Sequence, residues 1–361
     1  MREFGSEHPA IVLPDGYFNI FDQYGREVSY LRSGREALLL AALSCRLKVN
    51  EKDNVALIPA YCCWSMSAPF TKAGWRIVYY RLNEDLTVDV DYLIHLIDTV
   101  NPQTILTMNY FGSTPTNEAV VAVKDRNPHI VVIEDFSHCT FSFADIYNPL
   151  VDIYVSSIRK SIGVCDGAVI LSSLPLKRDY IQTDTEGFAD IRYRAQVEKK
   201  LYQWTYNQLT NRNFREILRG GEGIIDNFKQ VHSISERGRQ MLSIVNGSLV
   251  AYARKVNMDH LLRLLRGKIR TVPRLERSLT GAPFSCPILV ERRDNMQKTL
   301  ADNGLYAPIL WPINETAQKV CPVSKMMGEK MLSIPIDQRY DWNDIEQIAE
   351  ILLTTLNRGN S

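Results

Sequence analysis

The most informative stretch of this chain reads Asp152-Ile153-Tyr154-Val155-Ser156-Ser157-Ile158-Arg159-Lys160, followed by Ser161-Ile162-Gly163-Val164-Cys165-Asp166-Gly167-Ala168-Val169-Ile170-Leu171. A short β-rich run delivers two hydroxyls, an arginine and a lysine into a turn that contains glycine, and a second apolar run leaves that turn. Upstream, Asp135 ends another apolar run, Ile130-Val131-Val132-Ile133-Glu134-Asp135. Continuous apolar runs are typical of strands buried on both faces of a parallel sheet. We therefore predict a carboxylate at one strand end and an amine just beyond a nearby strand.

Short apolar segments alternate with helix-length segments from about Ser33 to Ser173. Strands are predicted at residues 54–59, 76–80, 104–108 and 130–133. Helices are predicted at residues 34–43, 90–100 and 117–126, the first with Ser33 as N-cap and Glu36 in the third position of a capping box. This alternation predicts an α/β fold whose mostly parallel sheet is flanked by helices. Ligands of such sheets bind at the carboxyl ends of the strands, where Asn109 and Asp135 stand.

The pattern changes in the last third of the chain. Residues 174 to about 270 are mostly helical by periodicity, and a long helical segment over residues 241–265 is interrupted near Asn246 and Gly247. Strands are then predicted at residues 286–291, 305–310 and 331–335, and helices at residues 293–302 and 342–356. We therefore predict a large domain over residues 1–250, including an N-terminal arm, and a small C-terminal α+β domain over residues 251–361.

Composition excludes several classes of protein. The net charge of +1 gives no electrostatic basis for binding nucleic acid or an anionic membrane. No apolar run approaches the ~20 residues that span a bilayer, and the charged segment Met1–Glu7 has no signal-peptide core. Seven cysteines without CxxC spacing suggest free thiols in a reducing compartment, and six scattered histidines do not suggest a metal site. We predict a cytoplasmic protein without a metal.

An aspartate and a lysine at neighbouring strand ends are the groups that pyridoxal phosphate (PLP) requires. The aspartate keeps the pyridine nitrogen protonated, so that the ring accepts electrons, and the lysine forms a Schiff base with the aldehyde. Taken singly, Lys160 is better explained as a solvated lysine and Asp135 as a helix cap, because most charged side chains are exposed. The pair gains weight from other segments that follow in order.

Five short segments carry a resemblance to a known family: Ser33–Ala37, Ile58–Tyr61, Asn109–Gly112, Glu134–His138 and Ser156–Lys160. Their order and spacing resemble the PLP-dependent sugar-nucleotide aminotransferases of the DegT/DnrJ kind. The resemblance implies the aspartate-aminotransferase fold, also called PLP fold type I. It covers residues 33–173 and returns at residues 305–312 and 333–340, whereas the middle of the chain matches poorly. Each segment is weak by itself, but the ordered set is specific.

The resemblance implies roles for particular residues. The catalytic residues would be Lys160 and Asp135. The cofactor would also be bound by Ser33, Gly34 and Arg35 in a phosphate loop, by Ser156 and Ser157 in the phosphate cup, and by Asn109 and His138 near the ring hydroxyl. A glycine that opens a helix suits an anion because the first helix amides donate to it. Family members stack an aromatic ring on the cofactor; the residue count places Cys63 there, but we favour the adjacent Trp64.

Two departures from the family pattern concern the phosphate partner. Many members carry a Gly-Tyr-Asn-Tyr-Arg segment that reaches the phosphate bound by the partner subunit. The corresponding segment here, Phe228–Glu236, lacks that asparagine, and the turn after Lys160 lacks the usual glycine-rich run. These departures put the cross-subunit contact and the sugar-nucleotide substrate in doubt, but they leave Asp135 and Lys160 untouched.

The function that the resemblance implies is transfer of an amino group from an amino acid to a keto acceptor. The acceptor would be a keto sugar nucleotide used in polysaccharide or amino-sugar biosynthesis, and the enzyme would be a homodimer. Two alternatives stay open. One is a different PLP reaction on the same fold, by a lyase or a decarboxylase, which Asp135 and Lys160 do not distinguish from transamination. The other is a non-catalytic regulatory relative, against which the presence of both residues counts.

Overall fold

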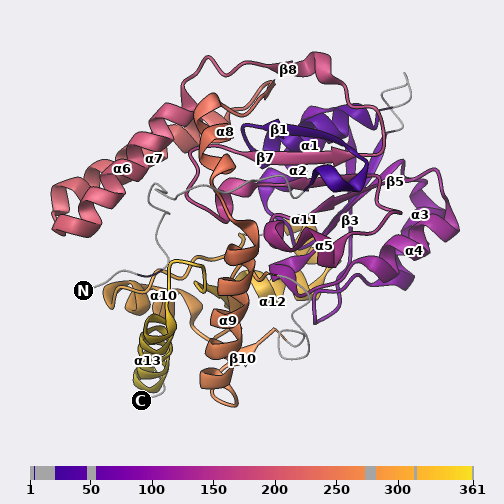
Figure 1. Ribbon diagram of the computed structural model, residues 1–361. Helices are drawn as coiled ribbons and strands as arrows, with labels where there is room; N and C mark the ends of the chain where they lie inside the picture. Colours follow the sequence, from indigo (N-terminus) through magenta and orange to yellow (C-terminus); the bar gives the residue numbers. More distant parts are fainter. Residues whose placement is uncertain (1–3, 5–20, 47–53, 273–281, 313–314, 360–361) are drawn as a thin grey trace.

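The computed structural model describes residues 4, 21–46, 54–272, 282–312 and 315–359. Its centre is a seven-stranded sheet with the strand order β1-β7-β6-β5-β4-β2-β3 (Figure 1). The strands are β1 (Glu27–Leu31), β2 (Val55–Pro59), β3 (Arg76–Tyr80), β4 (Thr104–Met108), β5 (Val131–Asp135), β6 (Ile153–Ser156) and β7 (Ala168–Ser172). Only β7 runs opposite to its neighbours, because both β1 and β6 pair with it in antiparallel fashion. The prediction of a mostly parallel sheet is confirmed.

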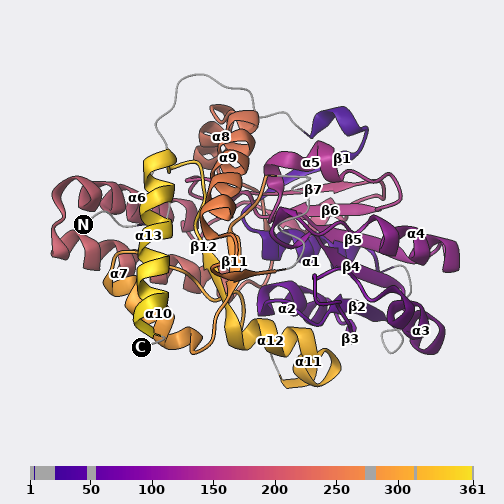
Figure 2. The same ribbon diagram turned by 90° about the horizontal axis from the view of Figure 1, so that it is seen from below.

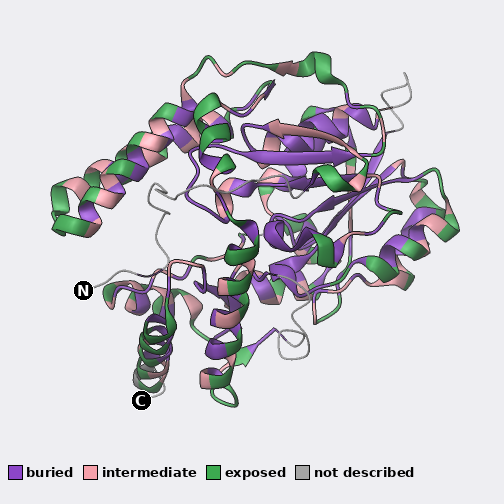
Figure 3. Cartoon of the chain, viewed as in Figure 1, coloured by how far each residue is buried: buried purple, intermediate pink, exposed green. Residues whose placement is uncertain are grey.

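Burial explains why the strand sequences are continuously apolar. Every residue of β2, β4, β5, β6 and β7 is buried, and the sheet forms the largest buried region of the chain (Figure 3). The surrounding helices are α1 (Gly34–Ser44), α2 (Trp64–Lys72), α3 (Val90–Val100) and α4 (Asn117–Arg126). Helix α1 packs against β6 and β7, which brings its N-terminus close to the turn that follows β6.

The N-terminus of α1 begins as the capping residues predict. The Ser33 hydroxyl accepts a hydrogen bond from the Glu36 backbone amide at 3.4 Å. The Glu36 carboxylate does not complete the capping box, because it accepts from the Ser33 hydroxyl at 2.8 Å and lies between Arg32 and His232. Both Arg32 and Glu36 are fully buried, so the start of α1 is held by a charged network rather than by a local cap alone.

A helical hairpin follows the sheet and projects from the body of the molecule (Figure 1). It consists of α6 (Phe188–Thr205) and α7 (Gln208–Asp226). The short strands β8 (Ile181–Gln182) and β9 (Val231–His232) pair in parallel at its base. Helices α8 (Glu236–Ser243) and α9 (Gly247–Leu265) come next. Asn246 caps α9 by accepting from the Leu249 amide at 3.1 Å, so the predicted interruption is confirmed.

The C-terminal part contains a three-stranded antiparallel sheet and four helices. The strands are β10 (Arg270–Thr271), β11 (Cys286–Leu289) and β12 (Met331–Ile334), and the helices are α10 (Arg293–Asp302), α11 (Glu315–Val320), α12 (Pro322–Lys330) and α13 (Trp342–Gly359). Helix α13 packs along α9 (Figure 2). The predicted domain boundary at residue 250 falls inside α9, and it stays a prediction.

One predicted strand is wrong. Residues 305–310 form no ladder, because Leu305 alone pairs, in an isolated bridge with Phe4. The Tyr306 amide donates to the Phe4 carbonyl at 2.8 Å, and the pairing ends there. Pro308 has no amide hydrogen to donate, so an apolar composition does not suffice for a strand at this place.

The predicted charged segment 1–7 lies outside the described residues, apart from Phe4. In the described ranges, no helix combines the length and the apolar character that crossing a bilayer would require. All seven cysteines are free thiols, and only Cys63 is not buried.

Candidate functional site

A small cavity lies at the carboxyl ends of β5 and β6, beside the N-terminus of α1. Its volume is about 40 Å³. The lining residues are Ser33, Gly34, Arg35, Leu38, Ser65, Met66, Asp135, Ser137, Ser157, Arg159 and Lys160. Segments from four parts of the chain thus meet where a parallel sheet offers a ligand site. Six of the predicted site residues line this cavity: Ser33, Gly34, Arg35, Asp135, Ser157 and Lys160.

Strand alternation decides which of two adjacent carboxylates faces the cavity. Asp135 is the last residue of β5 and lines the cavity, and its Oδ1 accepts from the Ser137 amide at 2.9 Å. Glu134 does not line it, because successive side chains of a strand point to opposite faces. Glu134 Oε2 instead accepts from the Thr116 hydroxyl at 2.7 Å, and burial raises the pKa of Glu134 to about 8.

Lys160 ends the 3-10 turn Ile158–Lys160 that follows β6. The turn is closed by the Lys160 amide, which donates to the Ser157 carbonyl at 3.2 Å. The side chain is half-buried and lines the cavity. Within the described part of the chain its amine has no hydrogen bond or ion pair, which leaves it available to a ligand.

The N-terminus of α1 lies in close contact with the residue that follows β6. A Cβ atom added to Gly34 would meet the Ser157 Cβ at 2.9 Å, so a larger residue at position 34 would push the two segments apart. The Ser157 amide donates to the Ser137 hydroxyl at 2.9 Å, which ties the end of β6 to the segment after Asp135. The start of α1 and the serines Ser33, Ser137 and Ser157 therefore line the cavity together, an arrangement suited to an anion.

Two arginines of the cavity are held by carboxylates of the projecting hairpin. Arg159 donates to both Glu222 oxygens, at 2.9 and 3.2 Å, and Arg35 forms an ion pair with Asp226. Glu222 Oε1 also forms an ion pair with Arg192 Nη1, at 2.5 Å. Burial raises the pKa of Glu222, but the charges of Arg159 and Arg192 outweigh this and hold it below its usual value. Helix α7 thus offsets the positive charge around the cavity with residues four positions apart.

His138 is buried and neutral. Burial lowers the pKa of His138 well below its usual value, and the charge of Lys160 lowers it further. Its Nδ1 accepts from the Phe111 amide at 3.2 Å, which assigns the ring proton to Nε2. The ring stacks on Phe284 at 4.5 Å between centroids, with an interplanar angle of 3°, and lies 5.6 Å from Trp311. His138 is therefore a hydrogen-bond donor held between aromatic rings.

Four predicted cofactor residues do not line the cavity. Asn109 is buried and accepts from the Thr114 amide at 3.2 Å, and Ser156 shares a 2.6 Å hydrogen bond with Thr140. His138 is buried, and Trp64 is 56% exposed beside Arg35. Neither Trp64 nor Cys63 is among the lining residues; Ser65 and Met66 of the same helix are. Whether these four touch a cofactor stays a prediction.

Ser65, Met66, Leu38, Ser137 and Arg159 line the cavity but were not among the predicted site residues. Ser137 and Arg159 stand within the segments that carry the resemblance, so their positions signalled them. No sequence motif marked Ser65 and Met66, because their position at the cavity depends on how α2 packs beside α1.

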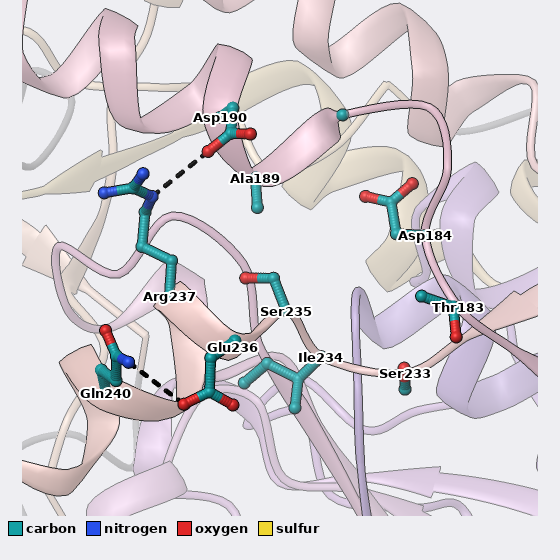
Figure 4. A pocket seen from close by; sticks show the side chains of 11 residues that line it. Thr183, Asp184, Ala189, Asp190, Ser233, Ile234, Ser235, Glu236, Arg237 and Gln240 are labelled. Atoms are coloured by element: carbon teal, nitrogen blue, oxygen red, sulfur yellow. Dashed lines mark hydrogen bonds and ion pairs between the residues drawn. The ribbon is translucent and has the colours of Figure 1, made fainter.

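A larger cavity of about 490 Å³ lies apart from this site, between the start of α6 and the start of α8 (Figure 4). None of the predicted site residues lines it. Asp190 forms an ion pair with Arg237 at 3.2 Å and Asp184 with Arg32 at 2.9 Å, whereas Glu236 accepts a hydrogen bond from the neutral Gln240 at 3.1 Å (the Asp190 and Glu236 contacts are drawn in Figure 4). No lysine is among the residues that line this cavity, so it does not bring an amine beside a carboxylate, and we do not assign the function to it.

A scan against protein-family models gives no match, and a search among curated proteins gives none either. Solved structures do share the fold. PseC of Helicobacter pylori, an aminotransferase involved in the biosynthesis of pseudoaminic acid, is 13% identical over 99% of this chain and 100% of that chain, at a TM-score of 0.68.

Two further structures give the same result. Spr1654 of Streptococcus pneumoniae, in its PMP form, is 12% identical over 99% of this chain and 100% of that chain, at a TM-score of 0.69. A DegT DnrJ EryC1 StrS aminotransferase from Brucella abortus is 16% identical over 92% of this chain and 86% of that chain, at a TM-score of 0.62. The predicted fold is therefore confirmed along nearly the whole chain.

Proposed function

We propose that this protein is a PLP-dependent aminotransferase. The observation that carries the proposal is that Asp135 and Lys160, from different strand ends, line one cavity together with the N-terminus of α1 and several serines. Transamination on PLP needs these three features together: a carboxylate for the ring nitrogen, an amine, and an anion site. The shared fold with solved aminotransferases supports the same reading.

The donor set fits the cofactor, although the cavity is narrow. Ser33, Ser137 and Ser157 would hold the phosphate together with the first amides of α1, and Gly34 permits the close approach. Arg35 and Arg159 line the same cavity, where Asp226 and Glu222 offset their charges. A volume of about 40 Å³ is well below the ~300 Å³ of ordinary ligand sites, so binding would require side chains at the mouth to move apart.

When bound, PLP supplies an aldehyde that joins an amine and a ring that takes up electrons. The residues around it would then divide the work. Asp135 would keep the ring nitrogen protonated. The Lys160 amine would take the proton from the substrate Cα as a general base and would then donate it as a general acid. His138 would donate from Nε2 toward the ring hydroxyl.

We propose an amino acid as the donor and a keto sugar nucleotide as the acceptor, the latter for polysaccharide or amino-sugar biosynthesis. The acceptor class is supported by PseC, whose own role is in pseudoaminic acid biosynthesis. A PLP-dependent lyase or decarboxylase is the alternative, because Asp135 and Lys160 serve those reactions too. A cytoplasmic location stays part of the proposal.

An absorption spectrum of the purified full chain with PLP tests the cofactor. We expect a band from the lysine-bound cofactor, abolished by borohydride, with the label on Lys160 in a peptide digest. Addition of a panel of amino acids should replace this band by that of pyridoxamine phosphate without release of carbon dioxide. Carbon dioxide release or an eliminated side chain would instead identify the alternative, and the absence of any lysine-bound band would reject the cofactor.

We further propose a homodimer. Near the turn between α6 and α7, Tyr202 and Phe214 are buried, whereas Trp204 and Tyr206 are 75% and 53% exposed. Leu209 beside them is 61% exposed. Such an apolar hairpin tip favours burial against a second copy, in an isologous interface of more than ~1,000 Å².

The expected result is a dimer at low micromolar concentration by sedimentation velocity. Trp204→Asp combined with Leu209→Asp should raise the dissociation constant about tenfold or more, because each dimer would bury four added charges. Tyr252→Asp on α9, which is 69% exposed, is the matched control and should leave association unchanged. A monomer at these concentrations with full PLP occupancy would contradict the proposal.

The contact of the partner subunit with the phosphate is proposed to be moved, weakened or lost. The asparagine that the family carries is missing near Val231, and the next residue, His232, bonds within its own subunit to Glu36 Oε1 at 2.7 Å. The Ser33 end of the cavity is therefore braced by the chain's own Phe228–Glu236 segment.

A further inference from the structure

One buried arginine that the proposed chemistry does not use links the C-terminal part of the chain to the turn that carries Lys160. This turn, Ile158–Lys160 with its C-cap Ser161, is called the lysine turn below. Arg254 stands on α9 and is 2% exposed. Its guanidinium donates four hydrogen bonds: to the Ser161 carbonyl at 2.8 Å, to the Phe284 carbonyl at 2.9 Å, to the Pro283 carbonyl at 3.2 Å and to Gln338 Oε1 at 2.9 Å. None of these acceptors is charged.

An arginine in this setting is costly to bury. Burial lowers the pKa of Arg254 to about 10, with the carboxylate of Asp337 acting in the opposite direction, so the side chain is still charged at neutral pH. A buried charge without a directly bonded carboxylate is retained only when its hydrogen bonds are satisfied. The planar guanidinium of an arginine can bond several acceptors at fixed angles at the same time, which the ammonium of a lysine does not do. The charge of Arg254 thus holds in place the four groups that accept its hydrogen bonds.

Ser161 is the residue that follows Lys160, and its carbonyl is bonded twice. Besides Arg254, Gln338 Nε2 donates to it at 3.0 Å. Gln338 also accepts from Arg254 Nε, so the two side chains orient one another. The peptide between Ser161 and Ile162, one residue after Lys160, is therefore held by two side chains from the C-terminal part of the chain.

The same guanidinium holds the backbone of the ring that stacks on His138. Arg254 Nη1 bonds the carbonyls of Pro283 and Phe284, and Phe284 lies parallel to the His138 ring at 4.5 Å. Loss of Arg254 would thus release both the lysine turn and the aromatic cover of His138. A side chain that served packing alone would have no need to reach these two places.

We propose that Arg254, oriented by Gln338, is a positioning residue that sets the place of the Lys160 amine and of His138 together. The catalytic importance of this role rests on the proposed function. The positioning itself is a property of the chain alone, and it is measurable without cofactor.

The test compares Arg254→Lys and Arg254→Met with the wild type in the full chain. The first readout is the rate at which an amine-acylating reagent modifies Lys160 without cofactor, measured by mass spectrometry relative to Lys325, which is 59% exposed. We expect this relative rate to change about fivefold or more in both variants. The second readout is the rate of borohydride-fixable PLP attachment, which should fall about tenfold, because bonds from a charged donor are lost. Arg254→Lys keeps the positive charge but lacks the planar guanidinium, so it separates the effect of the hydrogen-bond geometry from the effect of the charge.

Asn257→Ala is the matched control. Asn257 is buried on the same helix and donates to the carbonyls of Ile336, Asp337 and Tyr340 at 3.0 to 3.2 Å, but it does not touch the lysine turn. It should lower the midpoint of urea unfolding, as the Arg254 variants do, with Lys160 labelling and PLP attachment within twofold of the wild type. Gln338→Leu provides a milder variant if Arg254→Met does not fold, and about a threefold change in labelling is expected.

Unchanged Lys160 labelling in Arg254→Lys and Gln338→Leu would overturn the proposal, and so would an equal change in Asn257→Ala. If labelling shifts as expected while the wild type itself binds no PLP, the positioning role stands and the proposed function falls. If PLP attaches to every variant at the wild-type rate and Lys160 labelling does not shift, the positioning role falls and the proposed cofactor stands.

Discussion

Lys160→Ala is expected to abolish covalent attachment of PLP and all transamination, with no measurable loss of stability. Lys160 is the lysine that lines the cavity beside Asp135, and its amine has no hydrogen bond or ion pair in the described part of the chain. Removing it therefore breaks no interaction that the fold uses. The measurement is borohydride reduction of the PLP-loaded protein followed by mass spectrometry, together with urea unfolding of the unloaded protein.

A control separates loss of the site from loss of a lysine in general. Lys325→Ala removes an amine that is 59% exposed, and it should leave attachment and turnover at wild-type levels. Non-covalent binding of PLP to Lys160→Ala, through the serines and the first amides of α1, is compatible with the prediction. Borohydride fixation of PLP to the Lys160→Ala protein would show that another lysine has the role proposed here.

The sheet and its flanking helices were predictable because local signals agree there. The structure reproduces the predicted bounds of residues 76–80, 104–108, 90–100, 117–126 and 293–302. For example, Asp89 caps the helix at residues 90–100 by accepting from the Tyr92 amide at 3.0 Å, and a continuous apolar run marks the strand at residues 104–108. The strand expected at residues 305–310 failed because a strand needs a partner, and the partner available there, Phe4, is about 300 positions away and offers a single bridge.

The candidate site was predictable where it depends on strand ends. Asp135 ends β5 and Ser157 follows β6, and these strands are parallel neighbours, so the meeting of the two residues in one cavity follows from the sheet. The parts that depend on packing between distant segments were not predictable. Ser65 and Met66 arrive with α2, Glu222 and Asp226 arrive with the hairpin, and Arg254 reaches the lysine turn across the C-terminal part.

Asp135→Asn is the second variant with a large expected effect. The amide keeps the size of the side chain and can still accept from the Ser137 amide, as the carboxylate does at 2.9 Å. The fold and the attachment of PLP to Lys160 should therefore persist. Turnover should fall by roughly two to four orders of magnitude, because a neutral amide does not hold a proton on the ring nitrogen. Single-turnover conversion of an amino donor, followed by absorbance, measures this step.

The adjacent carboxyl supplies the control, since Glu134 has the same chemistry but faces the other side of the sheet. Glu134→Gln should leave turnover close to that of the wild type. Its effect should appear in stability, because the pKa of Glu134 is about 8 in the fold and 4.5 is its ordinary value. Between these values the unfolded chain has released a proton that the folded chain keeps, so the wild type loses stability as pH rises from about 4.5 to about 8. The glutamine variant should lose less over that range. Near-normal turnover in Asp135→Asn, or a collapse of turnover in Glu134→Gln, would show that the ring-nitrogen role does not belong to Asp135.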